Sequence, residues 1–337
     1  MRTGFQVSTI MPSAPKNRTR PAAPTKARAT KMSAFEKAVE DLRSQPASAF
    51  PNVSPRWLLG AAGVVLAAAL ALAWLALCLL YWQGSWQLLY HPKASVSRTP
   101  DSLGIPFHKV NFAATETGKT QLTGWWIPQG LSLQGPSRFT VLYLHGADGN
   151  LSDSVDALAA LHQQGLPVFA VDYRGYGQSE ALLTHGHPNE KQFRQDAEWS
   201  LTWLTVTRQV PPANILVYGS GLGANLAAEL AADHNELAGL ILDQPLQAPM
   251  KPVFDDSRSR LVPAHWLVTD QYDLNAAAAR LQIPSLWLMS QPAAEQPSAS
   301  LDAYSATRAR KSQSWLGQPA VTDPKFAETL RRWLDEL

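Results

Sequence analysis

The stretch Ile215-Leu-Val-Tyr-Gly-Ser-Gly-Leu-Gly-Ala-Asn-Leu-Ala-Ala-Glu-Leu230 decides the fold of this chain. Its first four residues are apolar or aromatic and two of them are β-branched, which is typical of a buried strand. Glycines follow at positions 219, 221 and 223, and an alanine-rich run with a preference for helix comes next. Glycine permits tight backbone turns because it has no Cβ. The stretch therefore predicts a strand, a sharp turn and a helix in direct succession.

The same alternation of strand and helix continues through the C-terminal two thirds of the chain. We expect strands at residues 120–127, 139–144, 168–172, 215–218, 237–242 and 285–289. We expect helices at residues 152–164, 190–207, 222–234 and 324–337. Such an order predicts an α/β fold with a mostly parallel central sheet and helices on both faces. Ligand sites of these sheets lie outside the carboxyl ends of the strands, so we expect functional residues in the segments that directly follow the strands.

An uncharged apolar run from Trp57 to Trp82 precedes this region. About 26 residues at 1.5 Å each exceed the roughly 20 that cross a bilayer core, which predicts one transmembrane helix over 57–82. A cleaved signal peptide is the main alternative, but its apolar region is shorter and ends at small residues. Here Tyr81, Trp82 and Trp86 follow, and aromatic residues are typical of the membrane interface. The predicted domains are a basic, largely disordered tail at 1–56, the transmembrane helix, and a folded domain at 83–337.

Charge predicts the orientation of this helix and argues against one class of partner. Ten Lys and Arg but only three acidic residues precede Trp57, whereas only Lys93 and Arg98 follow the helix closely. The positive-inside rule then predicts a single-pass membrane protein with a cytoplasmic N-terminus and an extracytoplasmic, periplasmic or lumenal domain. The net charge of the whole chain is +2, without the concentrated basic face that a nucleic-acid partner requires.

Few residues suggest a cofactor, a metal or a disulfide. The only cysteine, Cys78, lies in the apolar run, so no disulfide can form within the chain. His185 and His187 lie two residues apart in a Gly/Pro loop but lack a third ligand at a suitable spacing. We therefore expect no metal, nucleotide or organic cofactor.

Two further segments that follow strands carry a family resemblance. Val141-Leu-Tyr-Leu-His-Gly-Ala-Asp-Gly-Asn-Leu151 is similar to the loop after the third strand of α/β-hydrolases, and Val171-Asp-Tyr-Arg-Gly-Tyr-Gly-Gln-Ser-Glu180 is similar to their segment after the fourth strand. With the glycine-rich turn, they make residues 88–337 resemble the membrane-anchored, serine-aminopeptidase-like abhydrolase-domain group of the α/β-hydrolase superfamily. This resemblance implies the α/β-hydrolase fold.

The catalytic residues that the resemblance implies are missing at each expected position. The nucleophile elbow of the family is G-x-S-x-G, and here Gly219 and Gly223 flank Gly221 in place of serine. Ala293 occupies the position of the acid in the stretch that begins at Pro284. The histidine that should precede the last helix is also missing, because the last histidine of the chain is His265. The Ser-Asp-His triad is thus degenerate, with no histidine near the C-terminus.

A displaced set of residues is the alternative. Ser220 could act with His265 and with Asp243 or Asp270, although Ser220 lies one position early in the turn. In that register its side chain should point sideways or inward.

The backbone amides of an oxyanion site would remain even where the catalytic side chains are replaced. By resemblance, the amides of Ala147 and Leu222 would form an oxyanion site, with His145, Gly146 and Asp148 beside it. We expect His145 to support its loop.

Two readings of function follow. The first is a membrane-anchored, catalytically impaired protein that binds an acyl or peptide-like small ligand, or an unidentified protein partner. The second is an active esterase, thioesterase or peptidase that uses displaced residues such as Ser220. Residues 244–273 are expected to form a short cap over any ligand pocket, and Trp266, Trp287 and Trp315 to line that pocket or fill the core.

Overall fold

The computed structural model describes residues 36–41, 43, 54–114, 118–130, 135–180, 186–290 and 301–337. It divides into two compact units, residues 1–69 and 70–337, which are treated separately. Most of the predicted disordered tail lies outside the described residues, as do Ala293 and His185.

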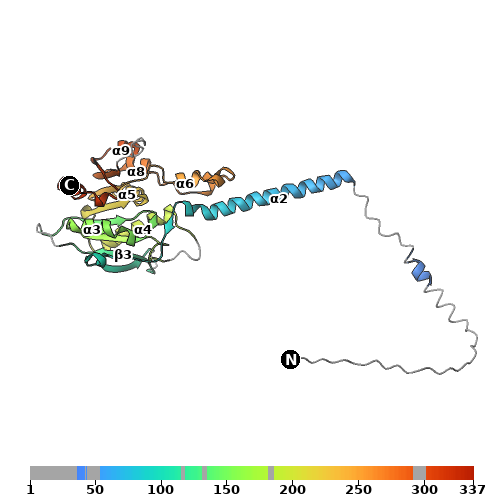
Figure 1. Ribbon diagram of the computed structural model, residues 1–337, viewed down its shortest axis with the longest axis horizontal. Coiled ribbons are helices and arrows are strands. Elements are labelled where there is room, and N and C mark those ends of the chain that lie inside the picture. The colour runs from blue at the N-terminus through green and yellow to red at the C-terminus, as the bar shows by residue number, and fades with distance from the viewer. Residues whose placement is uncertain are drawn as a thin grey trace, which may run out of the picture. The chain divides into compact units, whose positions relative to one another are not determined.

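An eight-stranded sheet forms the centre of the folded unit (Figure 1), in the order β10-β9-β8-β7-β4-β6-β3-β2. Its strands are β2 (His108–Ala113), β3 (Thr120–Ile127), β4 (Thr140–Leu144), β6 (Val168–Asp172), β7 (Ile215–Ser220), β8 (Gly239–Asp243), β9 (Ser285–Ser290) and β10 (Lys311–Leu316). The six strands from β10 to β6 are parallel, and β3 and β2 add antiparallel pairs at one edge. Two short strands, β1 (His91–Pro92) and β5 (Asp148–Gly149), pair separately.

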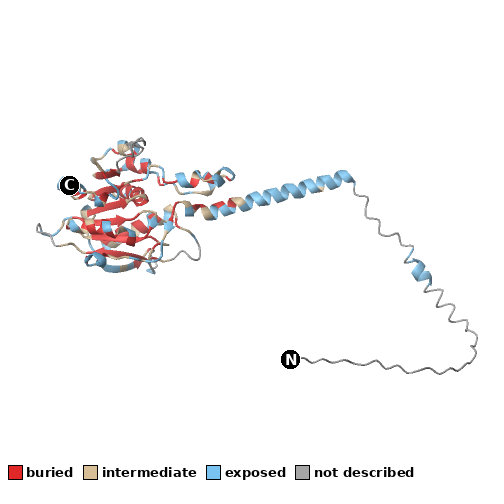
Figure 2. Ribbon diagram, in the orientation of Figure 1, coloured by how far each residue is buried: buried red, intermediate tan, exposed pale blue. Residues whose placement is uncertain are grey.

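Helices cover both faces of this sheet, as the alternation predicts. One apolar cluster joins the sheet to α3 (Val155–Gln163) and α10 (Phe326–Asp335). The other joins it to α4 (Glu190–Thr202), α5 (Leu222–Asp233) and α8 (Leu274–Arg280). Successive residues of β4 alternate between the two clusters, because neighbouring side chains of a strand point to opposite faces. Figure 2 shows the resulting buried layer along the central strands. The predicted α/β-hydrolase fold is confirmed.

The apolar run forms the long helix α2 (Pro55–Gly84), followed by a short 3-10 helix at Ser85–Leu88. Together they make one segment that is long and apolar enough to cross a membrane. Only Cys78 and Tyr81 of α2 are buried, and both lie near its C-terminal end. The helix therefore keeps most of its apolar surface free of protein contacts.

The predicted cap at residues 244–273 contains α6 (Lys251–Phe254), a 3-10 helix (Ser257–Arg260) and α7 (Ala264–Leu267). Two side chains of α2 hydrogen-bond to it: the Tyr81 hydroxyl donates to the Val253 carbonyl at 2.8 Å, and the Trp74 indole donates to the Leu261 carbonyl at 3.0 Å. We call residues 250–268 the cap segment. The cap segment packs against the C-terminal end of α2. The sequence predicted a roof over a ligand pocket and did not predict this contact with α2.

Candidate functional site

The turn between β7 and α5 has the geometry of a nucleophile elbow. Gly221 has φ 56° and ψ −121°, outside the backbone regions that residues with a side chain ordinarily adopt. Its N–H donates to the Asp243 carbonyl at 2.9 Å, which attaches the turn to the end of β8. The chain thus reverses from strand to helix in one residue.

Close backbone contacts explain the two flanking glycines. A Cβ on Gly219 would lie 2.2 Å from the Gly223 carbonyl oxygen, and a Cβ on Gly223 would lie 2.3 Å from the carbonyl oxygens of both Leu144 and His145. Neither backbone can move aside cheaply. Glycine is therefore required at both positions for α5 to pack against β7 and β4.

The central position of the elbow has the opposite environment. No atom lies within 4 Å of a Cβ built on Gly221, which is half-buried at the edge of a cleft. A side chain placed there would project into open space, as an elbow nucleophile does. The elbow backbone is present, and its tip carries no hydroxyl group.

The cleft above this elbow has a volume of about 670 Å³ and is lined by residues from the ends of four strands. They are Ser220, Gly221, Asp243, Gln244, Pro245, Leu246, Met289, Gln318 and Pro319. Gln318 lies just after β10, in the loop where the resemblance implies a histidine, and it is exposed. Gln318 was not predicted as a cleft residue from the sequence, although its position before the last helix is the signal that could have indicated it.

Ser220 faces a neighbouring tyrosine. It ends β7. Burial raises the pKa of Tyr143 to about 12, and the nearby hydroxyls of Ser154 and Ser220 oppose that rise. Ser220 therefore has a structural partner to its side, as its register predicts.

Asp243 is the most unusual polar residue of the cleft. It pairs with Ser220 in the register of the sheet and is only 6% exposed. Its Oδ2 accepts a hydrogen bond from the Tyr218 hydroxyl at 2.9 Å, whereas its Oδ1 has no hydrogen-bond partner among the described residues. Burial raises the pKa of this carboxyl to about 6, and the Tyr218 bond only partly opposes the rise. Asp243 is thus a buried carboxyl group beside a cleft, and one of its oxygens is buried without a hydrogen-bond partner among the described residues.

The structure does not bring the other members of the displaced set to Ser220. His265 lies in α7 and stacks on Phe254 at 4.2 Å between ring centroids, in a hollow separate from the cleft. Asp270 accepts a hydrogen bond from the Tyr90 hydroxyl at 2.6 Å and lines other pockets. Of the predicted alternative residues, only Ser220 and Asp243 line one cleft.

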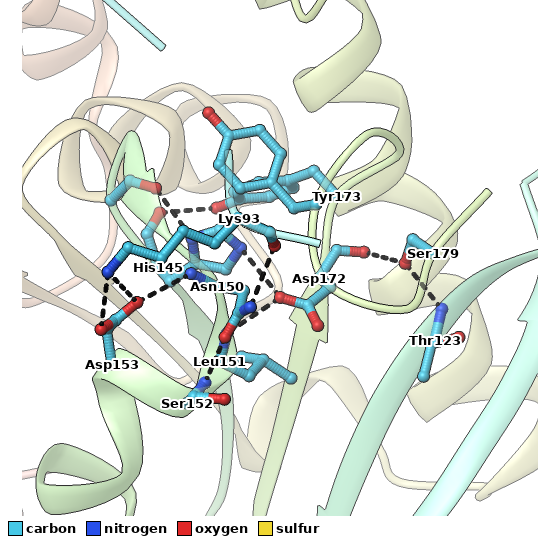
Figure 3. Close-up of polar contacts among 12 residues, drawn as sticks. Lys93, Thr123, His145, Asn150, Leu151, Ser152, Asp153, Asp172, Tyr173 and Ser179 are labelled. Atoms are coloured by element: carbon cyan, nitrogen blue, oxygen red, sulfur yellow. Dashed lines mark hydrogen bonds and ion pairs between the residues drawn. The ribbon is translucent and has the colours of Figure 1, made fainter. Parts of the chain in front are cut away.

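His145 lies in a buried polar network on the other side of the elbow (Figure 3). Its Nδ1 is 2.8 Å from the Gly146 carbonyl oxygen, and its Nε2 is 3.6 Å from Asp172 Oδ1 without a hydrogen bond. Burial lowers the pKa of His145 to about 4, so the imidazole is neutral at pH 7. Its ring packs against Tyr173, whose hydroxyl donates to the His145 carbonyl at 3.0 Å. These contacts support the structural role that we expected.

Asp172, at the end of β6, joins the two loops that resemble the family. Its Oδ1 accepts from the Leu151 amide at 2.9 Å, and the nearby Gln178 amide also favours the ionised form of this carboxyl. Its carbonyl accepts from the Ser179 hydroxyl at 2.5 Å (Figure 3). Burial raises the pKa of Asp172 to about 7 despite the two amides. Its many partners indicate a structural function.

The two amides expected at the oxyanion site come from the loop after β4 and from the start of α5. The Ala147 carbonyl accepts from the Tyr176 hydroxyl at 2.8 Å and from the His91 amide at 3.0 Å, which fixes the peptide that follows the Ala147 amide. Leu222 is the first residue of α5, and the first amides of a helix have no partner inside it.

The neighbours expected beside these amides occupy different positions. A Cβ on Gly146 would lie 3.4 Å from the Ser220 carbonyl oxygen, so this loop passes close to the elbow. Asp148 is exposed and lies 2.7 Å from His91 Nδ1. The oxyanion site remains a prediction that agrees with the placement of its loop.

Among the described residues, no three or more His, Cys, Asp and Glu side chains form a group that could hold a metal ion. Trp287 is fully buried, and Trp266 is 86% exposed, so neither lines the cleft.

Comparisons with known proteins give the family. The sequence profile described as "Serine aminopeptidase, S33" matches residues 135–320, more than half of the chain. An uncharacterized protein of Mycobacterium tuberculosis, MT2364, is 33% identical over 164 residues, which is 49% of this chain and 54% of that protein. Alpha/beta hydrolase domain-containing protein 17C of Xenopus tropicalis is 33% identical over 123 residues, 36% of this chain and 38% of that protein. The chain thus spans about half or less of the length of these curated relatives.

Solved structures support the same fold. The Pyrococcus furiosus esterase PF2001 aligns with a TM-score of 0.56 at 20% identity, over 74% of this chain and 98% of that one. An alpha-beta hydrolase of Vibrio vulnificus aligns with a TM-score of 0.50 at 23% identity, over 70% of this chain and 81% of that one. At such identities the likeness shows the fold alone. Together with the profile match, the strand order and the elbow, it establishes that the chain belongs to the serine aminopeptidase S33 family of α/β-hydrolases.

Proposed function

We propose that this chain is a membrane-anchored α/β-hydrolase-like protein that binds a ligand at its elbow and does not hydrolyse it through a serine triad. The observation that carries the proposal is Gly221, which holds the elbow conformation beside an open cleft and offers no nucleophile. The anchor is α2, with the N-terminus in the cytoplasm and the folded unit outside it.

The loss of chemistry extends beyond the nucleophile. Covalent hydrolysis needs a nucleophile activated by a neighbouring base. Gln318 lies where that base is expected, and a carboxamide does not take up a proton at neutral pH. Removal of triad members lowers turnover on the order of 10⁴-fold to 10⁶-fold. A chain that lacks the nucleophile and the base retains at most ligand binding and oxyanion stabilisation.

The remaining groups suit an oxygen-rich ligand. The amides of Ala147 and Leu222 and the N-terminus of α5 favour a carboxylate or a polarised carbonyl. Gln318 also lines the cleft, and its carboxamide contains both a donor and an acceptor. Asp243, when protonated, donates a hydrogen bond, and when ionised it accepts one. An acyl or peptide-like small molecule with a carboxylate or carbonyl group matches this set.

Fluorophosphonate labelling of the full chain in detergent, read by mass spectrometry, tests the proposal. The wild-type protein should acquire no adduct at Ser220 or elsewhere in the cleft. The double variant Gly221→Ser/Gln318→His should become reactive at position 221, because it places a hydroxyl and an imidazole in a cleft that already contains Asp243. The single variant Gly221→Ser is the matched control and should react far more slowly, since it lacks the base.

Ser220 supports the second candidate function, an active serine hydrolase with displaced residues. Ser220 and Asp243 are register partners at the same cleft. An adduct on wild-type Ser220 that disappears in Ser220→Ala would establish this alternative and refute the proposal. Partner capture by the folded unit would be compatible with either function.

A further inference from the structure

The cap segment exposes apolar side chains that no part of the described chain covers. Leu261 is 60% exposed and Trp266 is 86% exposed. Trp266 is more exposed than any other large apolar side chain among the described residues, including Leu59 of α2 at 74%. The neighbouring Val262 and Ala264 are buried, so the segment is folded and presents these two side chains outward.

Two hydrogen bonds hold the cap segment alongside α2. They start from Trp74 and Tyr81, which are seven residues apart and therefore about 10 Å apart along the helix. The cap segment thus follows roughly the last two to three turns of α2. Trp74, Tyr81 and the cap segment all belong to the same compact unit, residues 70–337.

The length of α2 places these turns at a membrane surface. The uncharged run has about 26 residues, and a bilayer core needs roughly 20, so a core that begins at Trp57 ends near Ala76. The surplus residues include Cys78 and Tyr81, the two that the folded unit buries. Trp74 then lies at the boundary of the core, the level at which tryptophan is enriched in membrane proteins.

We propose that the cap segment docks on the lipid bilayer beside α2, with Leu261 and Trp266 inserted at the interface. The proposal rests on α2 crossing the membrane, which is part of the proposed function. The Trp74–Leu261 hydrogen bond brings the segment to the boundary, so the exposed Leu261 continues the apolar surface of α2, and the exposed Trp266 lies five residues further along the same segment. A lipid surface is the occupant that this continuity selects.

The charges of the cap segment limit the depth of insertion. Lys251 pairs with Asp255 at 2.6 Å, and Arg258 pairs with Asp256 at 2.7 Å. Arg260 is also exposed. The cations Lys251, Arg258 and Arg260 therefore outnumber the two acidic partners. Charged groups of this kind remain at the headgroup level while apolar neighbours enter the acyl boundary. The segment therefore lies in the interface and does not cross the core.

Site-directed fluorescence in lipid nanodiscs tests the docking with the full chain. In a Cys78→Ala background, single cysteines at Trp266, Val206 and Leu66 would carry a polarity-sensitive probe. Nitroxide-labelled lipid should reduce the emission at position 266 by roughly half, and aqueous iodide should have little effect there. Val206 is the matched control because it is also apolar and 69% exposed but lies outside the cap segment, so iodide should quench it and the lipid nitroxide should not.

Position 66 separates failure of the docking from failure of the anchor. Leu66 is in the middle of the apolar run, and lipid nitroxide should quench its probe if α2 spans the bilayer. Quenching at 66 with an iodide-accessible probe at 266 would overturn the docking alone. A probe at 66 that is accessible to iodide would overturn the membrane anchor and the docking with it.

Discussion

Two buried aspartates at the carboxyl edge of the same sheet have different surroundings. Asp172, after β6, accepts a hydrogen bond from the Leu151 amide at its carboxylate and one from the Ser179 hydroxyl at its carbonyl, and so joins two loops. Asp243, after β8, accepts one bond from Tyr218 and leaves Oδ1 without a partner at the cleft. Burial raises the pKa of both carboxyls. A raised pKa alone therefore does not distinguish a carboxyl whose hydrogen bonds join two loops from one that keeps an unpaired oxygen, whereas the hydrogen-bond partners of each oxygen do.

The same contrast extends to the two sides of the elbow. On the side of β4 and β6, backbone atoms lie so close together that Gly219 and Gly223 cannot carry a side chain. On the cleft side, a Cβ on Gly221 would meet no atom within 4 Å, so a side chain there disturbs no packing. The fold thus constrains the backbone of the elbow far more strongly than it constrains the residues that perform chemistry.

The largest expected effect is that of Gly223→Ala. Its Cβ would lie 2.3 Å from two backbone carbonyl oxygens, so α5 would have to move away from β4. We expect the free energy of unfolding to fall by at least about 4 kcal/mol, a magnitude that indicates a specific steric mechanism. Urea denaturation of the full chain in detergent, followed by tryptophan fluorescence, measures this change.

Gly221→Ala is the matched control for that experiment. Its Cβ meets no atom within 4 Å, so only the positive φ is unfavourable, at about 1–3 kcal/mol. Equal losses in the two alanine variants would contradict the distinction between a constrained scaffold and an open tip.

Asp172→Ala should have the next largest effect. At pH 6, below the pKa of about 7, the carboxyl is largely neutral, and its removal leaves the buried amide of Leu151 without an acceptor. An unsatisfied buried group costs about 1–3 kcal/mol, so we expect a loss of about 1–3 kcal/mol in the same denaturation experiment. Asp148→Ala, at an exposed position, should change stability by less than about 0.5 kcal/mol. A small effect at Asp172 would remove its proposed role as a structural centre.

Sequence patterns predicted the central strands and the elbow but not the edges of the sheet. The buried strands read as continuous apolar runs, whereas β10 (Lys-Ser-Gln-Ser-Trp-Leu) is polar because it is an edge strand and only its last residue is buried. The glycine spacing indicated the turn because the close contacts that require glycine are local. The contacts of the cap segment with Trp74 and Tyr81 join residues more than 170 positions apart, and no local pattern records them.

The cleft could be predicted only in part for the same reason. Gly221 and Asp243 follow their own strands and were recognised as candidates. Gln318 was not recognised as a candidate, because it reaches the cleft only through the position of its loop. A carboxamide side chain also gives no sign of catalysis in the sequence. The open Oδ1 of Asp243 is likewise a property of the assembled site, since it depends on which donors the fold brings near.

The smallest predicted effect concerns the pH dependence that Asp243 adds to stability. Its pKa is about 6 in the folded protein and 3.8 for the free group, so between these pH values the folded state holds a proton that the unfolded state has lost. Stability therefore decreases as pH rises through this window and is level above it. Asp243→Asn keeps an acceptor for Tyr218 but cannot ionise. The variant should match the wild type near pH 4 and exceed it by about 2 kcal/mol at pH 7. His145 and Asp172 titrate in both proteins, so the difference between the two denaturation curves isolates Asp243. A pH-independent difference would mean that a ligand or water already satisfies the open Oδ1, and the contrast with Asp172 would then disappear.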